Sequence, residues 1–480
     1  MRITRSVNSA RLGRTTIGDC MRNIKQGIFA ICTTLVVAQI STADTLSDIY
    51  ESALRNDPVL RAARASFNAE REIKNIARGA LLPQLAMSGN YTTSEINDDS
   101  NSVIIINGAP LNSGATGLID SNETSYRVSL NQAFFDMPSW YSFKRSKALS
   151  ESAQAQFAAD QQSLIIRVSE AYFNVLRAYD NLQTRSAEER AIKRQLEQTR
   201  ERFEVGLLPI TDVHEAQAVF DDAAVNSLEA RGSLNIAFEG LQVLTGQNHQ
   251  VLAGLTDRFI ATNPEPLSNQ EWVDFAIGNN FQLKAAELGK DAAYNQAKAA
   301  ATARLPKITG SATYFDSDND GTRYTSPFES KQDGHSFVVS VTMPIWMGGS
   351  VDAQSRQAKQ RSIASNESFT ATKRNVIQSS RSLHQLVLTN TARVKARKQS
   401  ITSADSALQA TQAGYEVGTR NIVDVLVAQR SVYQARRNYA NARYDYILSM
   451  MRLKEVAGQL SPDDIYQLNS SLDPQLAIAK

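Results

Sequence analysis

The second half of this chain repeats its first half. Residues Glu204–Gln217 contain Glu-Val-Gly, then Ile-Thr-Asp-Val, then Ala-Gln, and nearly the same order returns 212 positions later over Glu416–Gln429. A second matching pair, Leu82–Gln84 and Leu305–Lys307, has a spacing of 223 positions. A change of spacing within a repeat indicates a loop that tolerates insertions. The repeat therefore predicts two structurally equivalent halves.

The first 43 residues have the features of a secretory signal peptide. Arg22 and Lys25 precede a short apolar run, and small residues follow it at 41–43. A membrane anchor needs about 20 apolar residues, and this run is shorter. We therefore predict cleavage of residues 1–43 and export of the rest. Met21 is as suitable a start as Met1, because the first 20 residues add nothing that a signal peptide needs.

The exported chain is slightly acidic and has no cysteine. Removing residues 1–43 takes away six of the 51 basic and one of the 49 acidic residues, which leaves a net charge of −3. The +2 charge of the whole chain is therefore no sign of a nucleic-acid partner. Cys20 and Cys32 leave with the signal, so neither a disulfide nor a thiolate metal ligand is expected. No apolar run of about 18 residues remains, and no membrane-spanning helix is expected.

Each half has two segments in which apolar and small polar residues alternate. They are Gln84–Thr93, Tyr126–Phe135, Lys307–Tyr314 and Phe337–Met343. Strands of about ten residues with one apolar side are typical of an outer-membrane barrel. A half-buried sheet of a soluble protein has the same alternation, so the pattern alone does not decide between the two.

The connections between these strands favour the barrel. Segments 95–124 and 316–335 are rich in Asn, Asp, Ser and Gly. We predict that each is a surface loop joining the two strands of one hairpin, 84–135 or 307–346. The apolar run Val103–Ile106 inside the first loop has no explanation in this scheme.

Helices of unusual length follow each hairpin. Segments 139–200 and 350–414 contain no proline, and the only glycine is the one at position 414. At 1.5 Å per residue each could extend about 95 Å. A Val-Gly pair ends each run, the glycine supplying the turn, and two further helices are predicted at 211–246 and 421–458. Residues 44–80 are expected to form a pair of shorter helices.

The two later helices carry heptad patterns. Steps of three and four residues connect Val213, Ala216, Phe220, Ala223, Ser227, Ala230, Leu234, Ala237 and Leu241, and likewise Val425, Ala428, Val432, Ala435, Tyr439, Ala442, Tyr446, Ser449 and Leu453. One seam position is alanine in seven of eight cases and serine in the other. An ordinary alanine-rich core stripe would not keep this register over four heptads in both halves. A coiled coil with closely approaching helices is predicted.

These elements together predict a mixed α and β fold. Four strands cannot close a barrel, since the smallest barrels have eight, and an open edge in lipid leaves backbone groups unpaired. Two, three or four copies would have to share one barrel of 8, 12 or 16 strands. All helices would leave on one side of the membrane and continue the barrel as a helical cylinder. We divide the chain into a signal peptide (1–43), two repeats (44–260 and 261–460) and a tail (461–480).

The chain resembles the TolC family of outer-membrane efflux proteins, the outer-membrane factors. The resemblance runs from about Thr45 to Asp473, and its motifs are Leu81–Leu85, Phe134–Met137, Ala171–Leu176, Gly418–Leu426 and Asn441–Tyr444. It implies a homotrimer with a twelve-stranded barrel in the outer membrane of a Gram-negative bacterium and an α-helical tunnel in the periplasm. It also implies a passive exit duct for drugs, toxins and other molecules in tripartite efflux and type I secretion. The implied partners are a periplasmic adaptor protein and an inner-membrane transporter.

The resemblance also implies a gate at the periplasmic end of the tunnel. In the family, links between neighbouring helices hold this end shut. Carried over by motif, the linking residues are Gln195, Asp212, Tyr415 and Arg420.

An aspartate ring that narrows the tunnel is implied as well, and it includes Asp424. Three copies of this carboxylate around a narrow axis would attract cations. The second aspartate expected one turn later is Val427 here, while the matching position of the first repeat carries Glu215. The ring has one acidic layer, or Glu215 completes it. A simpler explanation for both Asp212 and Asp424 is a favourable interaction of the carboxylate with the helix macrodipole in the first helical turn.

Two other classes of protein fit the sequence less well. An enzyme is disfavoured because the chain has no phosphate-binding glycine loop and its four histidines, His214, His249, His335 and His384, are scattered. Neither a metal nor a cofactor is expected. A secreted structural coiled coil or adhesin would explain the heptads but not the two matched hairpins. Dependence on detergent would separate the adhesin from the barrel.

Overall fold

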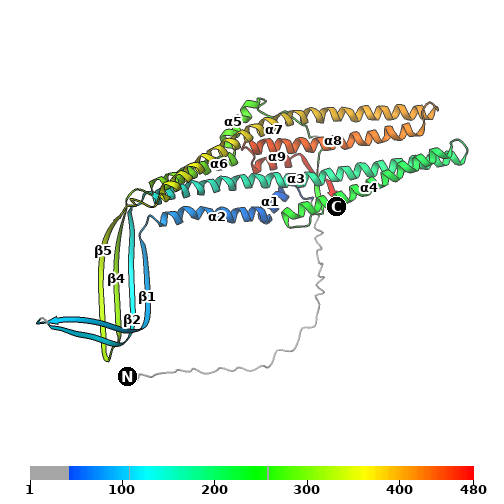
Figure 1. Ribbon diagram of the computed structural model, residues 1–480. Helices are drawn as coiled ribbons and strands as arrows, with labels where there is room; N and C mark the ends of the chain where they lie inside the picture. The colour runs from blue at the N-terminus through cyan, green and yellow to red at the C-terminus, as the bar shows by residue number, and fades with distance from the viewer. Residues whose placement is uncertain (1–42, 108, 257–258) are drawn as a thin grey trace, which may run out of the picture. The chain divides into compact units, whose positions relative to one another are not determined.

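The computed structural model describes residues 43–107, 109–256 and 259–480, and the predicted signal peptide lies almost entirely outside them. The helices are α1 (Leu46–Asn56), α2 (Pro58–Gly79), α3 (Met137–Glu204), α4 (Ile210–Thr245), α5 (Asn269–Asn279), α6 (Phe281–Thr302), α7 (Ser350–Glu416), α8 (Ile422–Val456) and α9 (Pro462–Asn469) (Figure 1). The strands are β1 (Gln84–Ile106), β2 (Ala109–Phe135), β3 (Val251–Leu255), β4 (Lys307–Arg323), β5 (Ser326–Thr342) and β6 (Leu472–Ala479). Of the helices in the described ranges, none is both long and apolar enough to cross a membrane.

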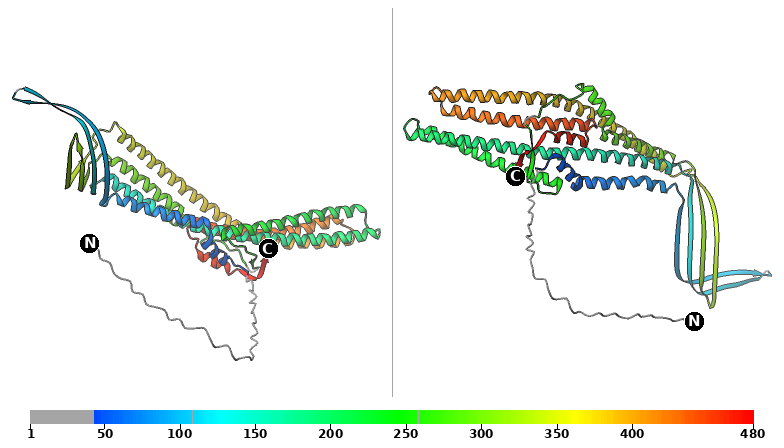
Figure 2. Two further views of the ribbon diagram at one scale, coloured as in Figure 1. Left: turned by 90° about the horizontal axis from the view of Figure 1, so that it is seen from below. Right: turned by 180° about the vertical axis from the view of Figure 1, so that it is seen from behind.

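The four long helices form two antiparallel pairs. Helix α3 has 68 residues and returns through α4, which has 36, while α7 has 67 residues and returns through α8, which has 35. Figure 2 shows both pairs from two further directions. Every position of the two predicted heptad seams is buried or half-buried, and Ala216, Ala442 and Leu241 are almost completely so. The heptad prediction is therefore confirmed, because the small seam residues lie where helices contact each other.

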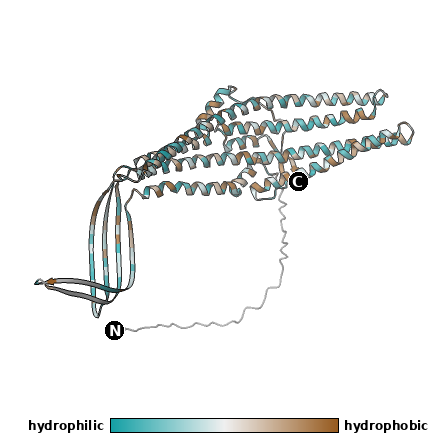
Figure 3. Ribbon diagram, in the orientation of Figure 1, coloured by the Kyte–Doolittle hydropathy of each residue, from teal (hydrophilic) through white to brown (hydrophobic). Residues whose placement is uncertain are grey.

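Four strands make one antiparallel sheet in the order β1-β2-β4-β5. Leu85, Met87 and Tyr91 of β1 alternate with polar residues and are at least 70% exposed, as is Phe337 of β5. Colouring by hydropathy shows this mixture of apolar and polar residues along the strands (Figure 3).

The prediction that 95–124 and 316–335 are loops is wrong, because most of each segment belongs to a strand. Strand pairing between β1 and β2 runs unbroken from Gln84 opposite Asn131 to Ile106 opposite Ala109. The pairing of β4 with β5 likewise continues to Arg323 opposite Ser326. Polar composition predicts loops only by correlation, since the hydrogen bonds of a ladder need backbone groups alone. The apolar run 103–106 is therefore the end of a strand.

A second small sheet joins distant parts of the chain. Strand β6 pairs with β3, so the tail after α8 returns to the segment that follows α4. The hydroxyl of Tyr172 on α3 donates a hydrogen bond of 2.6 Å to the carbonyl of Ala253 in β3. Together with α1 and α9, this sheet covers the middle of α3 and the C-terminal half of α8, and it belongs to the largest apolar core of the described chain. We call this covering layer the belt.

Candidate functional site

The ends of the two helix pairs have nearly the same turn. Gly206 after α3 and Gly418 after α7 have φ values of 77° and 76°, a left-handed conformation that glycine adopts without strain. The amide of Leu207 donates to the carbonyl of Arg202 at 2.9 Å, and the amide of Thr419 donates to that of Gly414 at 2.8 Å. These bonds close both helices in the same way and turn the chain back sharply.

An apolar cluster ties the ends of three helices together, with a fourth packed against it. Its buried members are Ile192 and Leu196 of α3, Val213, Ala216 and Ala223 of α4, and Ile422 and Leu426 of α8. Tyr415 of α7 packs against it from the side. We call this set the helix-end cluster. It positions the predicted gate residues, which all lie on or beside it.

Tyr415 is the predicted gate residue with the most distinctive surroundings. Its ring is half-buried, and the guanidinium carbon of Arg202 lies 5.1 Å from the ring centroid. Its hydroxyl is buried but has no hydrogen-bond partner among the described residues. A buried hydroxyl without a partner costs free energy, commonly about 1–3 kcal/mol. This hydroxyl is therefore a free donor and acceptor at the end of the helix pairs.

Arg420 and Asp424 lie close to each other at the start of α8. The nearest nitrogen and oxygen atoms of their side chains are 3.9 Å apart, and the two side chains are 62% and 40% exposed. An exposed pair at this distance contributes little to stability. The Asp424 carboxylate also accepts a bond of 3.4 Å from the Asn421 amide, while the Asn421 side chain accepts one of 2.8 Å from the Asp424 amide. Asp424 therefore forms a capping box with Asn421 at the start of α8. This role needs only one chain, and it agrees with the simpler explanation that the carboxylate interacts with the helix macrodipole.

The other predicted gate and ring residues lie near the helix-end cluster but are not bonded to one another. Asp212 is half-buried in the first turn of α4 and accepts a long bond of 3.4 Å from the Thr211 hydroxyl. Gln195 is half-buried on α3, and Glu215 is exposed. Within the described chain no hydrogen bond or ion pair joins Gln195, Asp212, Tyr415 and Arg420 to one another. Contacts inside one chain therefore do not form the predicted gate links.

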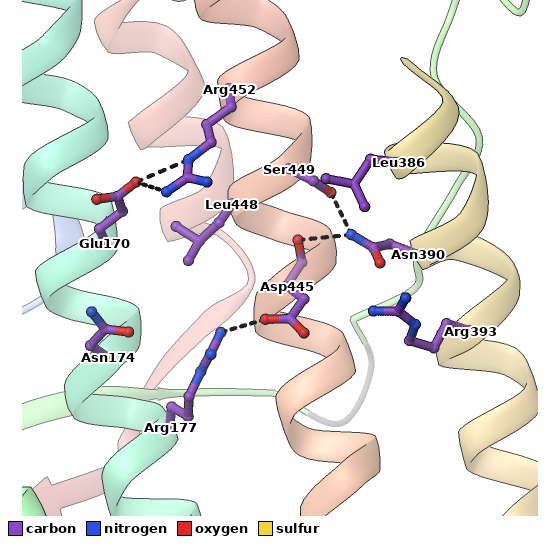
Figure 4. A pocket seen from close by; sticks show the side chains of 10 residues that line it. All are labelled: Glu170, Asn174, Arg177, Leu386, Asn390, Arg393, Asp445, Leu448, Ser449 and Arg452. Carbon is purple, nitrogen blue, oxygen red and sulfur yellow. Dashed lines mark hydrogen bonds and ion pairs between the residues drawn. The ribbon is translucent and has the colours of Figure 1, made fainter. Parts of the chain in front are cut away.

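A polar groove runs between the two helix pairs, starting near these ends. Val427 is 55% exposed and lines the groove, and Asp424 lies one turn before it on the same side of α8. Further along, Arg177 pairs with Asp445 at 2.7 Å and Arg452 pairs with Glu170 at 2.6 Å, as Figure 4 shows. We call it the inter-pair groove, lined by one stripe each of α3, α4, α7 and α8.

One ion pair that lines the groove is almost wholly buried. Glu188 of α3 and Arg437 of α8 are 2.7 Å apart. Burial lowers the pKa of Arg437, and the Glu188 carboxylate works in the opposite direction. Sequence reasoning missed this pair because no local pattern connects residues 249 positions apart.

The histidines and acidic residues of the described ranges do not come together as a metal site. Among them, no group of three or more His, Cys, Asp or Glu side chains is placed to hold a metal ion. His249 bonds to Asp44 at 2.7 Å and to Thr245 at 2.9 Å, while His384 is buried on α7. His214 and His335 are exposed on α4 and β5.

The sheet, the two long helix pairs and their joined ends define a class of proteins. A family model described as "Outer membrane efflux protein" matches residues 49–247 and 272–459. The chain belongs to this family. It is an outer-membrane factor of the TolC type, located in the outer membrane of a Gram-negative bacterium with its tunnel in the periplasm.

Individual relatives agree with this assignment. The outer membrane protein TolC of Vibrio cholerae is 36% identical over 432 residues, which cover 90% of this chain and 94% of that protein. TolC of Escherichia coli is 34% identical over 443 residues, covering 91% and 86%. The alkaline protease secretion protein AprF of Pseudomonas aeruginosa is 26% identical and covers 90% and 88%.

Solved structures show the same fold. The outer membrane protein VceC of Vibrio cholerae has a TM-score of 0.70 at 20% identity and covers 86% of this chain and 96% of its own. The open state of the MtrE outer membrane channel of Neisseria gonorrhoeae has a TM-score of 0.66 at 20% identity, covering 87% and 90%.

Proposed function

We propose that three copies of this chain form a passive exit duct across the outer membrane. The observation that carries this proposal is the four-stranded sheet, whose outer strands β1 and β5 have no further strand beside them among the described residues. An open edge in lipid would leave backbone groups without partners, at several kcal/mol each. Pairing β5 of one copy with β1 of the next would give twelve strands and a closed ring.

The periplasmic end of this duct is closed by links between neighbouring copies. The Tyr415 hydroxyl has no partner in the described part of the chain, and Arg420 and Asp212 have only weak ones there. A neighbouring copy would supply the missing partners, with Arg420 and Asp212 as a charge pair and Gln195 and Tyr415 as hydrogen-bonding residues. Movement of the α7/α8 pair would break these links and open the duct.

Asp424 narrows the closed end with a ring of negative charge. Its position on the groove side of α8 supports this role, because the same stripe continues through Val427. Val427 brings no charge, so Glu215 of the neighbouring helix pair would be the second acidic layer.

The cargo comprises drugs, toxins and secreted proteins delivered by other machinery. The relatives AprF and PrtF are named as protease secretion proteins, and the chain is also similar to TolC. These similarities support a shared duct for type I secretion and efflux. An inner-membrane transporter joined by a periplasmic adaptor would supply the energy and the choice of cargo.

Reconstitution into planar bilayers tests the duct. The purified protein should need detergent, form a three-copy complex and give stepwise conductance that rises when the gate links are removed. A water-soluble monomer without conductance would instead support a secreted coiled coil.

A further inference from the structure

The inter-pair groove has a regular charge pattern. On α7 its lining residues, Leu386, Asn390, Arg393, Arg397, Ser400 and Ala404, follow alternating steps of four and three. Steps of this kind keep residues on one side of a helix, so the whole stripe faces the groove. Lys395 and Lys398, on the same segment of α7, lie outside this stripe.

Positive charge exceeds negative charge in the groove. Seven arginines but only five acidic residues line it. Four of the acidic residues pair with arginines of α3 or α8. Within the described ranges, neither Arg393 nor Arg397 forms an ion pair or a hydrogen bond, and both are exposed. Figure 4 shows Arg393 next to the bonded pair Arg177 and Asp445. These two arginines are the unbalanced charge.

The first repeat has no such excess. The positions 212 residues before Arg393 and Arg397 are Asn181 and Arg185. Asn181 is neutral, and Arg185 lies 3.5 Å from the Glu188 carboxylate. Among the described residues that line the groove, the unpaired arginines therefore lie on α7.

The groove lies on the side of α8 that the belt leaves free. Ile447, Met450 and Lys454 face α9 and the segment 259–262, and Lys454 bonds to Asp464 of α9. Asp445 and Arg452 lie on the opposite side of the helix and line the groove. A belt inside a conduit would fill it, so the belt lies outside the proposed duct. The groove then faces the lumen.

We propose that Arg393 and Arg397 form a cationic band in the lumen that binds anionic solutes in transit. The band rests on the proposed duct, in which three copies would contribute six guanidinium groups. The planar guanidinium matches carboxylate, phosphate and sulfate groups with two parallel hydrogen bonds, so cargo bearing such groups is the class it fits. Arg397 precedes the turn at Val417 by 20 residues. At 1.5 Å per residue the band is about 30 Å from the helix ends, well separated from Asp424.

Ion selectivity of reconstituted channels tests the band. The double variant R393E/R397E reverses both charges, and K395E/K398E makes the same change of charge on the same helix segment outside the groove. Reversal potentials would be measured for both variants in a gradient of about 0.1 M against 0.01 M KCl, where charges act over roughly 10–30 Å.

R393E/R397E should lower the ratio of chloride to potassium permeability by about threefold or more, and K395E/K398E should leave it within about 1.5-fold. The difference should shrink at about 1 M salt, where charges act over only 3 Å. Equal shifts in the two variants, or no shift in either, would overturn the band while leaving the duct intact. Absence of any conductance in the unaltered protein would instead reject the duct itself.

Discussion

Glu188 of α3 and Arg437 of α8 form an ion pair of 2.7 Å, although their side chains are only 4% and 7% exposed. The guanidinium also donates a hydrogen bond of 2.7 Å to the side-chain oxygen of Gln434, and Arg185 lies 3.5 Å from the carboxylate. Removing one partner of a buried pair leaves the other charge in a medium of low polarity. The pair therefore fixes how α8 lies on α3, and it connects the two helix pairs.

Glu188→Gln should destabilise the protein strongly, because it leaves Arg437 buried without a carboxylate. We expect a loss of about 3–5 kcal/mol in the free energy of unfolding. Asp405→Asn is the matched control, since it breaks an exposed pair with the adjacent Arg436 at 3.4 Å and should cost under about 1 kcal/mol. Unfolding in guanidinium at a fixed protein concentration measures the free energy of unfolding of both variants. Equal losses in Glu188→Gln and Asp405→Asn would mean that burial of the Glu188–Arg437 pair is unimportant.

Loss of a gate link should open the helix ends. Asp212→Ala and Arg420→Ala should each raise single-channel conductance, because the proposed link between neighbouring copies loses one partner. Glu416→Ala is the control, since it removes an exposed carboxylate next to Tyr415 that is outside the link set. If Asp212→Ala and Arg420→Ala both conduct like the unaltered protein, these residues are not gate links.

The acidic ring should be separable from the helix cap. Asp424→Asn removes the charge but keeps an oxygen that can accept the Asn421 amide bond. Block by a trivalent cation such as hexaamminecobalt should weaken by about tenfold or more, since a ring of like charges attracts multivalent ions strongly. Glu215→Gln measures the second layer in the same titration. Block of unchanged strength in Asp424→Asn would leave Asp424 with its capping role alone.

Asp57 should make the free energy of unfolding depend on pH in the acidic range. It caps α2 through a 2.9 Å bond from the Leu60 amide and pairs with Arg167 at 2.7 Å. Burial works against its charged form, but Arg167 and the Leu60 and Val59 amides hold the pKa below its usual range. A lowered pKa contributes stability above the unfolded value of about 3.9 that is lost as pH falls through the folded value.

Asp57→Asn should therefore cost most at neutral pH, and its cost should decline as pH falls below about 4. Unfolding midpoints from pH 7 to pH 3 would follow this difference. A gap between the two proteins that stays constant over the whole range would show that the ionised carboxylate is not the source of the stability.

The long helices could be predicted from the sequence because their buried residues recur at regular intervals along the chain. The alanine positions of the two seams are spaced by sevens, and the structure buries or half-buries all of them. The length of the strands could not be predicted, because β1 continues through Asn97–Asn101, where nothing in the composition indicates a strand. Backbone pairing holds that part of the strand without help from apolar side chains.

The candidate site was only partly readable. Motifs identified Tyr415 and Asp424, and the structure places both at the joined helix ends. The unpaired Tyr415 hydroxyl could not be foreseen, because it depends on what α3 and α4 bring beside it. The groove charges were hidden for a similar reason, since each of its ion pairs joins two helices that are far apart along the chain.

Copy number and conductance, determined on the same detergent-extracted sample, test the central claim most directly. Native mass measurement should give three chains in one complex, and that sample should pass stepwise currents after insertion into a bilayer. A single chain that stays in solution without detergent and passes no current would contradict the account.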